Sequence, residues 1–291
     1  MTTPATRNVV SIVTPEPVME GAGVKLRRSL GTRTIDHLDP FLLLDHFESA
    51  NPSDYEAGFP YHPHRGIETV TVIRKGEVRH GDSLGHKGAI GAGDIQWMTS
   101  GSGIMHEEMP QVRPEGIAGL QLWLNVPARE KMSRPKYRDL TADRLTETAT
   151  DEGARIRVIA GPAAGGRVVG PVEGLAVAPT FIDVVLPPGT TFREAVPRGH
   201  TAFAYVDSGA VRFGAATSPA SAPALVIFGD GDVVEASAGP EGGRFLLAAA
   251  RPLGEPIARY GPFVMNTREE IEQTLAELRS GRFIREDPRD E

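Results

Sequence analysis

The feature that most limits the fold of this chain is a succession of short alternating segments separated by glycine-rich turns. Glu68 to Arg74 reads Glu-Thr-Val-Thr-Val-Ile-Arg, and Leu120 to Val126 alternates in the same way. A period of two places alternate side chains on opposite faces of a β-strand. The 33 glycines and 24 prolines suit the tight turns that connect such strands. Short strands at close spacing predict an all-β fold built from antiparallel sandwiches or barrels.

The same pattern of short strand-like segments and glycine-rich turns is found again after a more polar stretch, Pro127 to Gly153. With 291 residues, two domains are the expected count. We therefore expect an N-terminal barrel over residues 1–140 and a second barrel over residues 141–291. Strands in the second half are expected at Arg155–Ala160, Thr180–Leu186, Phe203–Val206, Ala224–Phe228 and Arg244–Ala249.

One helix is predicted, close to the C-terminus. Thr267 can cap its start, and Ile271, Leu275 and Leu278 form an apolar stripe at helical spacing. We expect a helix at about 267–280 that ends the second domain, followed by a solvated tail from Arg285 to Glu291.

Two pairs of potential metal ligands lie in the first half of the chain. His62 and His64 are separated by one residue, and so are His106 and Glu108. On a strand, each pair points to one face. Three imidazoles and one carboxylate suit Fe(II), Mn, Co, Ni, Cu or Zn, so the donors do not name the metal. Glu68, four residues past His64, would share the face of His64 on a continuous strand, and spacing alone leaves the choice of carboxylate open.

The remaining observations restrict the class of protein. His37, His80, His86 and His200 are expected to be ordinary surface or hydrogen-bonded histidines, and the second half offers no ligand pair. The net charge of −7 without a basic run argues against direct binding of nucleic acid. The chain has no cysteine, so a thiolate site is excluded. No signal peptide or membrane span is recognisable, and a cytoplasmic protein is expected.

Several long stretches, in order along nearly the whole chain, resemble the pirin family, a bicupin family of the cupin superfamily. The resemblance is carried by Arg27–Gly31, Leu38–Phe47, His62–Thr69, Gly93–Pro110, Gly119–Asn125, Glu130–Met132 and Gly261–Thr267.

This resemblance implies two cupin barrels with one metal, Fe(II) first, in the N-terminal barrel. The family's ligands match His62, His64, His106 and Glu108. The resemblance thus favours Glu108 over Glu68 as the carboxylate, whereas the general cupin pattern would use Glu68. Glu108 would also be the catalytic base.

Two functions from different classes follow as expectations. The first is a dioxygenase of the quercetinase type, an oxidoreductase that opens a flavonol with dioxygen and releases carbon monoxide. The alternative is an iron-dependent, redox-responsive module that binds a protein partner, as in pirin-like regulators of transcription or of metabolic enzymes. The first takes a small aromatic substrate, and neither binds nucleic acid directly or requires a membrane.

Overall fold

The structure is a computed structural model that describes residues 3–285. The chain divides into two compact units. Unit 1 comprises Met1–Pro15 and Asp143–Pro252, and unit 2 comprises Glu16–Ala142 and Leu253–Glu291. Among the described residues, no helix has the length and hydrophobicity that crossing a membrane requires.

The expected division into residues 1–140 and 141–291 differs from these units at both ends of the chain. The first strand, β1 (Val9–Val13), pairs with β21 (Ala224–Phe228) in unit 1. The C-terminal helix belongs to unit 2 and not to the second barrel. The physical reason is that strand pairing and helix packing join segments more than a hundred residues apart, which a local pattern does not reveal.

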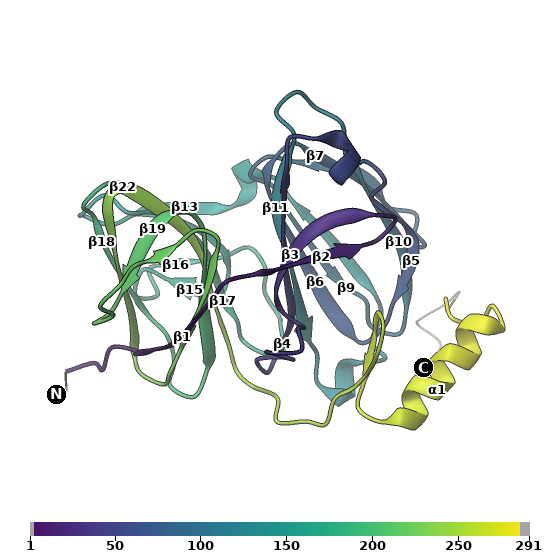
Figure 1. Ribbon diagram of the computed structural model, residues 1–291. Helices are drawn as coiled ribbons and strands as arrows, with labels where there is room; N and C mark the ends of the chain where they lie inside the picture. The colour runs from purple at the N-terminus through teal and green to yellow at the C-terminus, as the bar shows by residue number, and fades with distance from the viewer. Residues whose placement is uncertain (1–2, 286–291) are drawn as a thin grey trace. The chain divides into compact units, whose positions relative to one another are not determined.

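Unit 2 contains a seven-stranded antiparallel sheet and a four-stranded antiparallel sheet (Figure 1). The larger sheet has the order β12 (Lys136–Leu140), β9 (Ile95–Thr99), β6 (Ile67–Lys75), β11 (Ile117–Asn125), β4 (Phe41–Ser49), β3 (Val24–Leu30) and β2 (Glu16–Glu20). The smaller sheet has the order β5 (Phe59–His64), β10 (Ile104–Gln111), β7 (Glu77–Asp82) and β8 (Lys87–Gly91). Both alternating segments noted in the sequence are central strands of the larger sheet.

Unit 1 is built around one nine-stranded sheet (Figure 1). Its main path is β1, β21, β19 (Thr201–Phe213), β22 (Val233–Ala250), β17 (Thr180–Leu186), β14 (Arg155–Ala160) and β13 (Thr146–Ala149). Off this path, β18 (Thr191–Ala195) pairs with β22, and β20 (Ala220–Ser221) pairs with β19. A two-stranded ribbon joins β15 (Pro162–Ala163) to β16 (Val168–Val169), and the core gathers around Phe192, Phe213 and Phe245. The strands predicted for the second half are confirmed, although β19 and β22 are longer than expected.

The predicted helix is confirmed as α1 (Arg268–Arg279). Thr267 accepts a hydrogen bond from the backbone N–H of Glu270, and the Glu270 carboxylate accepts in return from the backbone N–H of Thr267. This capping box satisfies amides that the first turn leaves free. The apolar stripe of α1 packs near Phe263, which lies on the hairpin of β23 (Ala258–Tyr260) and β24 (Phe263–Met265). Short 3-10 turns occur at Pro52–Asp54, Ala128–Glu130 and Ala142–Arg144, and the expected tail beyond Arg285 lies outside the described residues.

A buried lysine holds three segments of unit 2 together. Lys131 is 1% exposed, and its Nζ donates to the carbonyls of Gly66 and Val264 at 2.9 Å and to Asn125 Oδ1 at 2.6 Å. Burial lowers the pKa of Lys131 to about 8, which leaves the ammonium charged at neutral pH. Its three N–H donors therefore match three acceptors, at the start of β6, the end of β11 and β24.

Replacing this ammonium should destabilise unit 2. Lys131→Met keeps the length of the side chain but leaves three buried oxygen acceptors without this donor, and we expect a loss of about 2–4 kcal/mol in the free energy of unfolding. Urea denaturation followed by tryptophan fluorescence measures it. The exposed Lys87→Met is the matched control and should change stability by less than about 0.5 kcal/mol. Equal urea midpoints for the two variants would show that the Lys131 ammonium does not stabilise unit 2.

Candidate metal centre

Three histidines converge in the interior of unit 2. His62 and His64 lie on β5, and His106 lies on the neighbouring β10, opposite His62 in the antiparallel register. The ring centroids are 4.9 Å apart for His62 and His64, 4.4 Å for His62 and His106, and 5.0 Å for His64 and His106. One ligand nitrogen from each ring lies within 4.8 Å of the others. The predicted histidine pairing is therefore present, because strand register brings the two motifs together.

Burial keeps two of these imidazoles, those of His64 and His106, neutral. His64 and His106 are 3% and 1% exposed. Desolvation lowers the pKa of His64 to about 3, and burial followed by the neighbouring histidines lowers the pKa of His106 well below its usual value. Neither ring nitrogen of His106 has a hydrogen-bond partner among the described residues. Neutral rings with free lone pairs are the form in which histidine binds a metal.

The orientation of His62 adds to this fit. Its Nδ1 lies 2.9 Å from the carbonyl oxygen of Pro60, and because a carbonyl only accepts, Nδ1 carries the proton. In the neutral tautomer with this proton, the lone pair is on Nε2, which faces Nε2 of His64 at 3.1 Å, within hydrogen-bond distance. A proton on Nε2 of His64 bridges the two nitrogens, and a cation can take its place. This donor set fits a divalent transition metal.

Glu108 lies on β10 two residues beyond His106, and a different set of side chains holds it. Its carboxylate accepts hydrogen bonds from Gln121 Nε2 at 3.1 and 2.9 Å and from Thr71 Oγ1 at 3.2 Å. The register shifts between the two residues, so that His106 faces His62 while Glu108 faces Phe59. Among the described residues, the group of closely spaced ligand atoms contains the three histidines and not Glu108.

Glu68 lies elsewhere in the unit. The extended strand is interrupted between β5 and β6 at Gly66. This residue adopts a φ of 78°, and a Cβ atom there would clash with the carbonyl oxygen of Val264. His64 and Glu68 therefore belong to different sheets, and the continuous strand that would align them does not exist. The Glu68 carboxylate accepts from Trp97 Nε1 at 3.2 Å and from Thr99 Oγ1 at 2.9 Å, and burial raises its pKa. These contacts give Glu68 a role in holding β6 to β9.

The sequence analysis did not single out Gln121. Its amide is oriented by Trp123, whose Nε1–H donates to Gln121 Oε1 at 3.4 Å and so leaves the NH2 group facing Glu108. Trp123 also packs edge-on against His64, with ring centroids 5.0 Å apart. The alternation along β11 was visible in the sequence, but the inward direction of Gln121 was not, because either face of a central strand can be buried.

His80 was expected to be ordinary, and it lies beside the cluster. Its ring centroid is 5.5 Å from that of His106 and 4.2 Å from that of Tyr137, on which it stacks. Its Nε2 lies 3.2 Å from Asp82 Oδ2, and the partly exposed His86 contacts the same oxygen at 3.0 Å. His80 and Asp82 share the spacing of the ligand pairs, which is the signal that could have placed them here.

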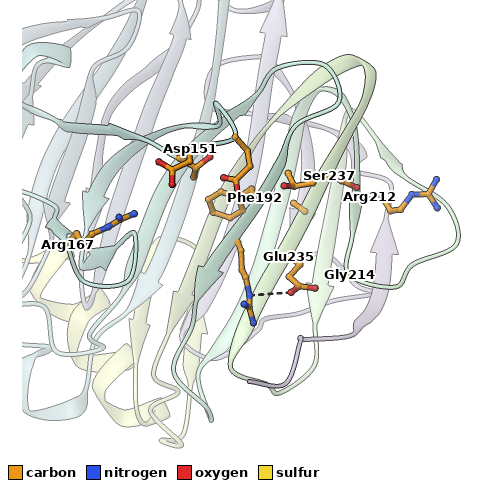
Figure 2. Close-up of a pocket in the computed structure, with 12 residues that line it drawn as sticks. Asp151, Arg167, Phe192, Arg212, Gly214, Glu235 and Ser237 are labelled. Carbon is orange, nitrogen blue, oxygen red and sulfur yellow. Dashed lines mark ion pairs between the residues drawn. The ribbon is translucent and has the colours of Figure 1, made fainter. Parts of the chain in front are cut away.

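Unit 1 has a hollow of a different kind, shown in Figure 2, with a volume of about 500 Å³. Side chains of both charges line it, among them Asp151, Arg167 and Arg212. Arg193 and Glu235, which are opposite one another in the register of β18 and β22, form an ion pair in its wall at 3.3 Å. None of the predicted site residues lines this hollow.

Comparisons with known proteins agree with this architecture. The pirin family model matches residues 23–124, and the model of the pirin C-terminal cupin domain matches residues 181–284. The chain is 45% identical over 277 residues to a pirin-like protein of Caulobacter vibrioides, covering 95% of this chain and 99% of the relative. It is 40% identical over 268 residues to human pirin, covering 90% and 89%.

A solved structure gives the same result. The crystal structure of quercetin 2,3-dioxygenase from Acinetobacter baumannii superposes with a TM-score of 0.85 at 33% identity, covering 96% of this chain and 99% of the other. The predicted all-β fold with two cupin domains and a C-terminal helix is confirmed.

Loss of one imidazole should abolish tight binding of a divalent metal. We expect His106→Ala to weaken binding of nickel(II), measured by isothermal titration calorimetry, at least about a hundredfold, since ligands contribute more than the side chains that support them. The exposed His37→Ala controls for a general effect of losing a histidine and should leave affinity unchanged. Unaltered nickel affinity in His106→Ala would place the metal site elsewhere.

Proposed function

The chain belongs to the pirin family, and we propose that it is a metal-dependent dioxygenase of the quercetinase type. Such an enzyme opens a flavonol with dioxygen and releases carbon monoxide. The observation that carries the proposal is the cluster of three converging imidazoles inside unit 2, of which burial keeps those of His64 and His106 neutral. The similarity to a solved quercetin 2,3-dioxygenase over nearly the whole chain supports it.

In this proposal, His62, His64, His106 and Glu108 hold one divalent metal, with Fe(II) as the first candidate. The bound metal supplies Lewis acidity and redox chemistry to the flavonol and dioxygen. His64 and His106 suit this task because burial lowers their pKa values and so prevents their protonation at neutral pH. His62 is partly exposed, so the organic substrate approaches from its side of the cluster.

Glu108 is proposed as the base that takes the proton from the flavonol hydroxyl. The O–H bond breaks, the proton moves to a carboxylate oxygen, and the same proton returns to the product. Gln121 and Thr71 both donate hydrogen bonds to this carboxylate, which fixes its direction. Glu108 is 5% exposed, so little bulk water competes for the proton.

A second candidate is an iron-dependent, redox-responsive module that binds a protein partner. The observation in its favour is Tyr61, which is 51% exposed and directly precedes His62. Exposed aromatic side chains are frequent anchors in protein interfaces. A partner that contacts Tyr61 would lie one residue from the cluster and could respond to a change there.

Turnover separates the two candidates. We expect protein loaded with Fe(II), Mn(II), Co(II) or Ni(II) to consume quercetin and dioxygen in a ratio of one to one and to release one carbon monoxide, measured by an oxygen electrode and by carbon monoxide binding to reduced haemoglobin. His106→Ala, treated identically, is the control and should be inactive. No turnover with any of these metals would overturn the dioxygenase proposal and leave the binding module.

The two carboxylates make a matched pair of variants. Glu108→Gln should weaken nickel(II) binding about 10–100-fold and reduce turnover at least as much, because a ligand and a base are lost together. Glu68→Gln should leave nickel affinity within about threefold and lower stability by about 1 kcal/mol, because one accepted hydrogen bond is impaired. The opposite order of effects on affinity would mean that Glu68 is the ligand.

A further inference from the structure

A narrow cavity of about 30 Å³ lies beside Glu108 within unit 2. Apolar side chains from several strands form most of its wall, including Val24, Phe47, Val78 and Ile117. The polar end of the wall is formed by Glu108 with its two hydrogen-bonding neighbours. The cavity therefore joins an apolar interior to the proposed catalytic carboxylate.

The polar groups of the wall are largely occupied by one another. Gln121 turns its NH2 group to the Glu108 carboxylate, and Thr71 donates its hydroxyl proton to the same group. The exception is the hydroxyl of Tyr55, which is buried and has no hydrogen bond within the described residues. A buried water typically makes about three hydrogen bonds, so one free hydroxyl offers water a poor site.

The size of the cavity selects its occupant. Its volume exceeds the roughly 10–15 Å³ that a cavity needs to hold one water, whereas pockets for drug-sized ligands measure about 300–1,000 Å³. A flavonol does not fit, but an apolar diatomic molecule does. Tyr55 could donate one hydrogen bond to such a molecule. Phe47 and Phe59 are partly exposed, so a path from solvent would run between apolar rings.

We propose that this cavity is a binding site for dioxygen, which reaches the centre from the Glu108 side while the organic substrate arrives from the His62 side. This inference rests on the proposed dioxygenase function for the identity of the gas. The existence of the site as a dry pocket for a small apolar molecule does not depend on turnover, and the two can be tested separately.

Binding is tested with krypton, an apolar atom that scatters X-rays anomalously. Crystals of the full chain pressurised with krypton should show an anomalous peak inside the cavity. Val78→Ile adds one methylene to the wall and should abolish the peak, whereas Val126→Ile, at a buried valine outside the wall, should retain it. A wild-type cavity without krypton, or with an ordered water that krypton does not displace, would overturn the site whether or not the protein turns over quercetin.

The role of the site is tested by oxygen kinetics. In Val78→Ile we expect the KM for dioxygen to rise about tenfold, since one methylene in a pocket changes discrimination by at least this factor, while the KM for quercetin and the nickel content stay unchanged. Ile117→Val removes one methylene and should lower the KM for dioxygen or leave it at the wild-type value. If Val78→Ile lost krypton but kept the wild-type KM for dioxygen, the cavity would not be the oxygen site.

Discussion

Three imidazoles packed within reach of one another, two of them buried and neutral, are the main constraint on the interior of unit 2. Burying polar atoms without partners costs free energy, and His106 has two such atoms. Nε2 of His62 and Nε2 of His64 face one another at 3.1 Å, so that one proton or one cation lies between them. An arrangement of this kind persists only where the surrounding structure holds it, and a divalent cation is what would relieve it.

The scaffold supplies that support from both sides of the cluster. Arg65, directly after His64, is 1% exposed and donates from Nε to the carbonyl of Ser102 at 2.7 Å, in the turn that precedes β10. Its guanidinium also forms an ion pair with Glu277 of α1 at 2.7 Å. The C-terminal helix, more than two hundred residues away in the chain, thus fixes the backbone that carries two of the three histidines.

On the Glu108 side of the histidine cluster, polar side chains lie next to the centre and apolar side chains lie beyond them. Gln121 and Thr71 direct the Glu108 carboxylate, and beyond them the interior becomes hydrophobic. This gradient separates a region where a proton can be held from one where a small apolar molecule can reside. Unit 2 therefore offers two different environments, a polar one around Glu108 and an apolar one beyond it, next to one histidine cluster among its described residues.

Local sequence patterns were enough to predict the class of fold, the C-terminal helix and the two histidine motifs, because these depend on periods of two and 3.6 residues between neighbouring positions. Local spacing could not decide between Glu68 and Glu108. The tertiary structure shows that the strand is interrupted at Gly66, so that Glu68 belongs to a different sheet from His64. It also shows a shift in strand register between His106 and Glu108. The positions of Gln121, His80 and α1 were decided in the same way. Each depends on pairing between distant strands, where a shift of one residue moves a side chain to the opposite face.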